Sequence, residues 1–174
     1  MFLSMEEQMK RARSIFSKMP DQLFDMYIRS LIHDVGYWPF CTCSDLTSGT
    51  DWHRIFSSVS LYEQATCSWK LDTITPDCYN ITPRSLGDIN LMLQNYEGTL
   101  FFKVGGYDYD YCKKSTEYHI RHLQKFGTYY LPVVIYPIVG QFHVLDGNHR
   151  IGAALHLLAT IGQSYSIPAW IAEV

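Results

Sequence analysis

The sequence lacks a long apolar run and an excess of positive charge. No stretch reaches the roughly eighteen apolar residues of a membrane-spanning helix. The formal net charge is −3, so a protein that coats nucleic acid is not indicated, and DNA contact would need a local basic patch. The first turns carry several charged side chains, namely Glu6, Glu7, Lys10, Arg11 and Arg13. This pattern argues against a signal peptide.

Metal-binding cysteine motifs and the common phosphate-binding loops are also absent. The chain has five cysteines, an odd number in a sequence long enough for a core, which favours reduced thiols and a cytoplasmic location. Cys41 and Cys43 form a C-x-C pair, but no second pair follows at zinc-site spacing. The sequence contains no P-loop, no Rossmann fingerprint and no Gly-x-Ser-x-Gly elbow. The corresponding mechanisms therefore have no support.

The N-terminal part has helical patterns. The chain has 174 residues, of which 47% are hydrophobic, enough for one domain with a small extension. Ser4 and Glu7 match a capping box, which predicts a helix to about Lys18. Pro20 begins a second helix, and apolar residues recur at threes and fours in both. We expect a helical hairpin within an N-terminal helical extension at residues 1–65.

Strand and helix patterns are mixed along the rest of the chain. Apolar periodicity and turn residues predict helices at 51–65, 85–96, 115–127 and 151–161. Strands are expected at 67–74, 99–104, 131–138, 141–145 and 167–172, with an acidic, aromatic loop at 107–111. The third and fourth strands form a hairpin across Val139 and Gly140. This order predicts an α+β fold, with a small mixed β-sheet and flanking helices.

The chain is organised around the turn Asp146–Arg150. A strand pattern leads into it and a helix pattern leads out, so backbone N–H groups at the helix start favour an anion. Gly147 permits a sharp turn, Asn148 is a good N-cap, and the Arg150 guanidinium matches a phosphate. A basic first turn opposes the helix dipole, which indicates an anion site. The alternative is that Arg150 pairs with Asp146 or extends into solvent, and that His149 is merely exposed.

The C-terminal part resembles a known fold family. The resemblance is carried by the helix that stops at Gly127, the strand pattern Leu131–Tyr136, the segment Phe142–Arg150 and the strand Ile167–Ile171. Together they resemble the ParB/sulfiredoxin-like fold, and Leu71–Asp77 is similar to that family's first strand. The resemblance defines a nucleotide-binding domain at residues 66–174. The helices before it have no counterpart that we can name.

The resemblance implies nucleotide binding at the turn. In this family partition proteins hydrolyse CTP, sulfiredoxins use ATP, a free-serine kinase carries an Asp-Gly-His-His-Arg turn, and some plasmid fertility-inhibition proteins are associated with ATPase and DNase activity. By this resemblance Gly147, Asn148, His149 and Arg150 would hold phosphates, and Asp146 would place a metal or the turn. Sulfiredoxin has its reactive cysteine where this chain has Asn148, so the chain is not expected to be a true sulfiredoxin. The variant is closest to the kinase-like form.

The resemblance implies phosphoryl transfer from ATP, CTP or another nucleoside triphosphate, with Mg²⁺ as the cofactor. Asp146 is the candidate metal ligand and catalytic group, although bonding the backbone of the turn is an equally good role for it. His149 could contact a β- or γ-phosphate. A water or hydroxyl nucleophile needs a carboxylate base, for which Asp72 and Asp77 are the candidates.

The helix expected at 115–127 carries further candidate ligands. His119 and His122 have metal-compatible spacing, but no third ligand is identifiable, so surface histidines are favoured. Lys113, Lys114, Arg121 and Lys125 could contact a phosphate or a nucleic-acid backbone. A solvated face is the more common meaning of such a run.

Three functions stay open. The first is an NTP hydrolase or phosphotransferase. The second is a DNA-binding nuclease or a plasmid or phage accessory protein of the fertility-inhibition type, which would grip a DNA phosphate with the same turn. The third is a non-catalytic module whose N-terminal helices dock on a protein partner. An apolar stripe exposed along residues 5–32 would favour this last function.

Overall fold

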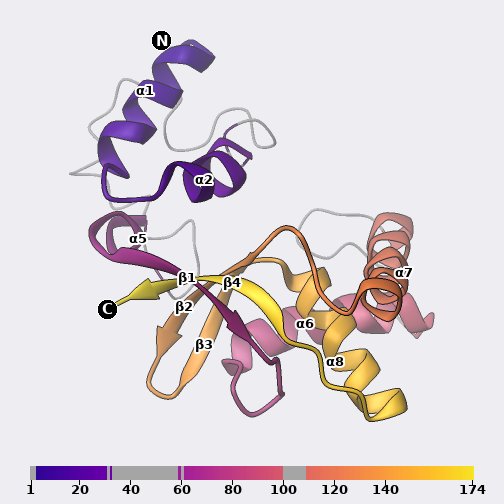
Figure 1. The fold of residues 1–174 in the computed structure, drawn as a ribbon. Coiled ribbons are helices and arrows are strands. Elements are labelled where there is room, and N and C mark those ends of the chain that lie inside the picture. Colours follow the sequence, from indigo (N-terminus) through magenta and orange to yellow (C-terminus); the bar gives the residue numbers. More distant parts are fainter. Residues whose placement is uncertain (1–2, 31, 33–58, 60, 100–108) are drawn as a thin grey trace. The chain divides into compact units, whose positions relative to one another are not determined.

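The computed structural model describes residues 3–30, 32, 59, 61–99 and 109–174 (Figure 1). The chain divides into two compact units, one made of Met1–Lys70 with Ala172–Val174 and the other of Leu71–Ile171. Most of the helix expected at 51–65 and of the strand expected at 99–104 lies outside the described residues. No helix within the described ranges is long and apolar enough to cross a membrane.

Short helices make up the described part of the first unit. They are α1 (Met5–Ile15), α2 (Asp21–Leu23), the π-helical segment η1 (Phe24–Ile28) and α5 (Leu61–Thr66). The predicted capping box is confirmed, because the Glu7 N–H donates to Ser4 Oγ at 3.3 Å and the Ser4 N–H donates to Glu7 Oε2 at 2.8 Å. Helix α1 ends at Ile15, earlier than the predicted Lys18.

The apolar stripe of these helices is buried. Ala12, Phe16, Leu23, Ile28 and Ile32 each have an exposed fraction of 0%. Burying a Leu, Ile or Phe side chain contributes about 1.5–3 kcal/mol, so the stripe stabilises the unit itself. Although Met5 is exposed, the described part of residues 5–32 does not present the exposed stripe that a docking module would need.

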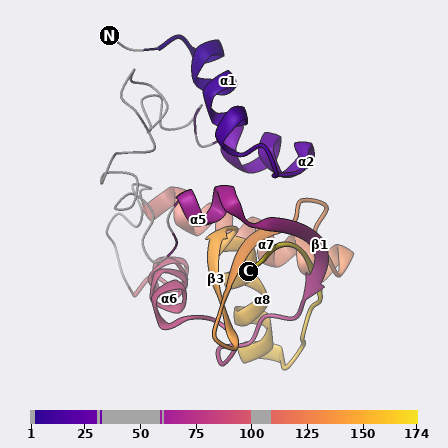
Figure 2. The same ribbon diagram turned by 90° about the vertical axis from the view of Figure 1, so that its left-hand side faces the viewer.

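The second unit is built on a mixed sheet (Figures 1 and 2). The strands are β1 (Ser68–Ile74), β2 (Val133–Ile138), β3 (Gln141–Asp146) and β4 (Ile167–Glu173), and their order is β1-β4-β2-β3. Strand β2 pairs antiparallel with β3 and parallel with β4. The predicted α+β class with a small mixed sheet is confirmed.

Three helices pack against one another and against this sheet. They are α6 (Pro83–Glu97), α7 (Tyr109–Phe126) and α8 (Asn148–Ile161). One apolar core contains Ile89 of α6, Leu123 of α7 and Ile151 of α8 together with the alternate residues Val133 and Ile135 of β2. Alternate strand residues in the core are expected where helices cover one face of a sheet.

Most of the expected elements of this unit are confirmed, and two expectations are wrong. The hairpin, the helices that stop before Gly98 and Gly127, and the last strand are present. The acidic loop does not extend over residues 109–111, which form the first turn of α7 because its buried stripe already begins at Cys112. The strand expected at 67–74 is present as β1, but only Trp69 is buried and only Ile74 is half-buried along it, because β1 lies at the edge of the sheet.

Candidate functional site at the start of helix α8

The turn between β3 and α8 begins with a β-bulge. Ile135 pairs with Val144 while Val134 pairs with Asp146, so Leu145 is an extra residue in β3. A bulge re-aims the side chains that follow it. Gly147 then takes φ 101° and ψ 24°, a left-handed conformation that favours glycine.

Gly147 is required for space as well as for conformation. A Cβ at this position would lie 2.5 Å from Val133 Cγ1 and 2.9 Å from Val133 Cβ. Contacts this short would force β2 and the turn apart. Gly147 is also the N-cap residue of α8, and Asn148 is the first helical residue. The predicted N-cap at Asn148 is therefore wrong by one position.

Polar groups at the start of α8 lack the partners that helix starts usually have. Among the described residues no side chain caps this helix, so the N–H groups of its first turn have no side-chain acceptor there. Asn148 Oδ1 and His149 Nε2 are buried and make no hydrogen bond with a residue that the structure describes. Because buried polar groups are normally bonded, these atoms mark a place where a polar ligand would improve the structure.

The Arg150 guanidinium is held by three oxygen atoms of the protein. Its Nη1 donates to the carbonyls of Leu131 at 2.8 Å and Pro132 at 2.7 Å, and its Nη2 lies 2.7 Å from Asp146 Oδ2. The pairing of Arg150 with Asp146, one of the two arrangements left open by the sequence, is the one present. The guanidinium ties the turn to the segment before β2, and phosphate binding through Nη1 would require these bonds to be exchanged. Nε takes part in none of the three contacts.

The Asp146 carboxylate keeps one oxygen available. Oδ2 accepts from Arg150, whereas Oδ1 makes no hydrogen bond or ion pair with any described residue. The side chain is 43% exposed. Asp146 therefore both stabilises the turn and retains an oxygen that could bind a cation.

His149 is neutral at pH 7 and is oriented by Thr116. Burial lowers the pKa of His149 and the charge of Arg150 adds to this lowering, while Asp146 opposes it. His149 Nδ1 lies 3.2 Å from Thr116 Oγ1. When the Thr116 hydroxyl donates to Nδ1, the single proton of the neutral ring is on Nε2. Nε2 is then a hydrogen-bond donor without an acceptor among the described residues.

A pocket of about 390 Å³ adjoins Arg150. Its walls are formed by Tyr118, His119, His122, Tyr129, Tyr130, Leu131 and Arg150. The Tyr129 hydroxyl donates to the His119 carbonyl at 3.1 Å and lies 3.4 Å from the Arg150 carbonyl, which links α7 to α8. Burial lowers the pKa of His119 to about 4, assisted by the charge of Arg150. His119 Nδ1 and His122 Nε2 are buried and have no hydrogen-bond partner in the described part of the chain.

The two candidate base carboxylates lie apart from this pocket. Asp72 is on β1, which β4 and β2 separate from β3 in the sheet order. Asp77 Oδ1 accepts the N–H of Tyr79 at 2.9 Å and so stabilises the turn after β1. Neither carboxylate lines the pocket beside Arg150. Within the described ranges, no group of three or more His, Cys, Asp or Glu side chains could hold a metal ion.

Several residues of the site carry no signal in the sequence. Leu131 and Pro132 act through their carbonyls, which no side-chain pattern reveals. Thr116 is an ordinary helix residue until the fold places it against His149. Tyr129 and Tyr130 do stand out as an aromatic pair directly after a helix end, and this pair was the available signal for the pocket.

No protein-family model, no curated protein and no solved structure matches this chain.

Proposed function

We propose that the second unit binds a nucleoside triphosphate, such as ATP or CTP, at the start of α8 and, with Mg²⁺, hydrolyses it or transfers its terminal phosphate. The strongest support is that several features suited to a nucleotide lie together at the start of α8. Uncapped amides, two unpartnered side chains and an adjoining aromatic pocket occur together there. The ParB/sulfiredoxin-like resemblance of residues 66–174 points to the same ligand.

The phosphates would be held by the first turn of α8. Backbone N–H groups of Asn148, His149 and Arg150 are suited to phosphate oxygens, and the helix dipole adds to the attraction. His149 Nε2 supplies a further donor, and rotation of the Asn148 amide by 180° replaces its unpartnered oxygen with an NH₂ group. Arg150 contributes positive charge and the rigidity of the turn, since Nη1 is bonded to carbonyls.

The nucleobase would occupy the pocket beside Arg150. Tyr118 is 62% exposed and Tyr130 is 80% exposed, so both rings are accessible for stacking. His119 is held neutral by its low pKa and can hydrogen-bond to a base without carrying charge. A volume of about 390 Å³ lies within the range of small-ligand sites, roughly 300–1,000 Å³.

A divalent cation fits this arrangement through Asp146. Mg²⁺ is commonly held by one or two carboxylates and by substrate phosphates rather than by a complete protein cage, and Asp146 Oδ1 is available for that role. Bound Mg²⁺ would neutralise charge on the phosphate oxygens. Asp146 is also the carboxylate adjoining the turn, whereas Asp72 or Asp77 could serve as the base only after a movement that brings them to it.

Thermal unfolding with nucleotides tests the proposal. ATP, ADP, CTP and GTP are added with and without Mg²⁺, and a ligand at one hundred times its Kd stabilises the native state by about 2.7 kcal/mol. We expect a raised Tm with at least one triphosphate, lost in His149→Ala and kept in His156→Ala. His156 is a matched control because it is also a partly buried histidine on α8. No shift with any nucleotide would contradict the proposal.

A further inference from the structure

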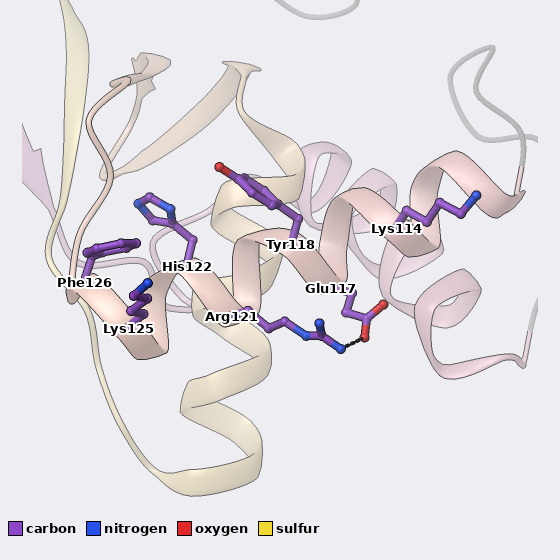
Figure 3. A pocket seen from close by; sticks show the side chains of 7 residues that line it. All are labelled: Lys114, Glu117, Tyr118, Arg121, His122, Lys125 and Phe126. Carbon is purple, nitrogen blue, oxygen red and sulfur yellow. Dashed lines mark hydrogen bonds and ion pairs between the residues drawn. The ribbon is translucent and has the colours of Figure 1, made fainter.

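A second hollow lies along α7 beside the pocket that adjoins Arg150, and Tyr118 and His122 line both. It has a volume of about 360 Å³ and is lined by Lys114, Glu117, Tyr118, Arg121, His122, Lys125 and Phe126. All seven side chains come from the one helix, as Figure 3 shows. We name it the α7 groove.

Aromatic rings form one row of the α7 groove. Tyr118, His122 and Phe126 recur every four residues, so they lie on one side of the helix. The ring centres of Tyr118 and His122 are 6.0 Å apart, and those of His122 and Phe126 are 4.7 Å apart. Tyr130 continues the row at 6.3 Å from Phe126. Phe126 is 49% exposed, which is unusual for a ring that serves only a core.

Positive charges form the adjoining row. Lys114, Arg121 and Lys125 line the groove, and Glu117, paired with Arg121, is the one acid among the lining residues. Lys125 Nζ lies 5.0 Å from the centre of the Phe126 ring. The groove thus has three cations and one acid, although the whole chain has a net charge of −3. A protein with a negative net charge needs a local basic patch of this kind to bind a polyanion.

We propose that the α7 groove binds single-stranded nucleic acid, with bases stacked on Tyr118 and Phe126 and with backbone phosphates beside Lys114, Arg121 and Lys125. Proteins that bind single strands combine exposed aromatic rings, on which bases stack, with nearby cations that contact the phosphates. A duplex offers phosphates but keeps its base faces stacked, and an acidic peptide offers charge but no planar rings. The row of rings is therefore the feature that selects a single strand.

The spacing of the rows agrees with this ligand. Four residues of α-helix rise about 6 Å, so successive rings, and the cations Arg121 and Lys125, are separated by a step that an extended, unstacked strand can follow. Lys114 lies seven residues before Arg121, a rise of about 10 Å. Tyr118 serves in both proposed sites, but Lys114, Lys125 and Phe126 line only the α7 groove and not the pocket beside Arg150. The inference therefore does not require the proposed nucleotide function.

Fluorescence anisotropy of the full chain with labelled oligonucleotides tests this site. The probes are a twelve-nucleotide single-stranded DNA, the same sequence as RNA, its duplex and a labelled poly-glutamate peptide. We expect a single strand to bind more tightly than the duplex or the peptide. With three phosphate contacts, the slope of log K against log salt should be about −2.

Variants that touch only the groove separate it from other causes. Phe126→Ala should raise the Kd at least about fivefold through lost stacking, and Lys125→Glu should raise it further, whereas Lys10→Glu should change it less than twofold. Lys10 is a matched control because it is an exposed helical lysine of the other unit. Far-ultraviolet circular dichroism confirms that each variant is folded. Three results would each overturn the proposal. They are an equal effect of Lys125→Glu and Lys10→Glu on the Kd, tighter binding of the duplex or the peptide than of the single strand, and no binding by 100 µM protein in low salt.

Discussion

Replacement of Gly147 by alanine tests the geometry on which the site depends. The left-handed conformation, with φ 101°, costs an L-residue about 1–2 kcal/mol. The new Cβ would also lie 2.5 Å from Val133 Cγ1, and Val133 is fully buried in the core. Overpacking of this kind costs about 1–3 kcal/mol. The free energy of unfolding should therefore fall by about 2–5 kcal/mol, a large part of a typical domain's stability.

The control is Gly162→Ala at the other end of the same helix. Gly162 has φ 68° and no atom within 4 Å of a built Cβ, so this variant carries the conformational cost without the clash. Urea unfolding of both variants gives the difference directly. The double variant Gly147→Ala/Val133→Ala should be less destabilised than the sum of its parts, because two of the close contacts share one side chain. Equal losses for Gly147→Ala and Gly162→Ala would refute the steric argument.

Three further predictions concern stability. Arg150→Ala should lower the free energy of unfolding by about 2–3 kcal/mol, because it leaves two carbonyls and Asp146 without their charged donor. Arg29→Ala is the control, because it removes an exposed ion pair and should lower the free energy of unfolding by less than about 1 kcal/mol. Equal losses in urea unfolding would contradict the structural role of Arg150. Val139 has φ 36° in a tight hairpin and is fully exposed. Because Asn tolerates a positive φ in such turns, Val139→Asn should raise the free energy of unfolding by about 1 kcal/mol and with it the Tm. An unchanged or lower Tm would argue against strain at this residue. The pKa of His119 is about 4 in the folded protein and about 6.5 when unfolded, so the unfolded state binds more protons between these values. Its contribution to stability is complete above pH 6.5 and is lost as the pH falls towards 4; His119→Gln should flatten this part of the profile, and an identical profile would contradict it.

Local chemistry made the helices and the hairpin predictable from the sequence. Ser4 with Glu7, Gly98 and Gly127 mark helix ends through side-chain or backbone requirements that act within a few residues. The two short apolar runs on either side of Val139 and Gly140 likewise predicted the hairpin. Two of the wrong expectations arose where tertiary packing decides, namely at the start of α7, where Cys112 is buried, and along β1, which lies at the sheet edge.

The candidate site was predictable in position but not in detail. A strand, a glycine turn and a helix start are visible in the sequence as Asp146–Arg150. The pair with Asp146 was one of the arrangements that the sequence left open, but the other two partners of Arg150 are not visible, because they are backbone carbonyls nineteen and eighteen residues earlier in the chain. The β-bulge at Leu145 and the contact between Thr116 and His149 also depend on the register of packed elements. Sequence patterns specify such registers only coarsely.

The central claim, that the start of α8 binds phosphate, is tested most directly by nuclear magnetic resonance of the ¹⁵N-labelled full chain. Mg²⁺ and ATP or CTP are titrated into the protein while the backbone amides are observed. We expect the amide resonances of Asn148, His149 and Arg150 to shift most and saturably, while that of Ile161 at the far end of the helix does not move. Unmoved resonances at the first turn, or larger shifts only elsewhere in the chain, would contradict it.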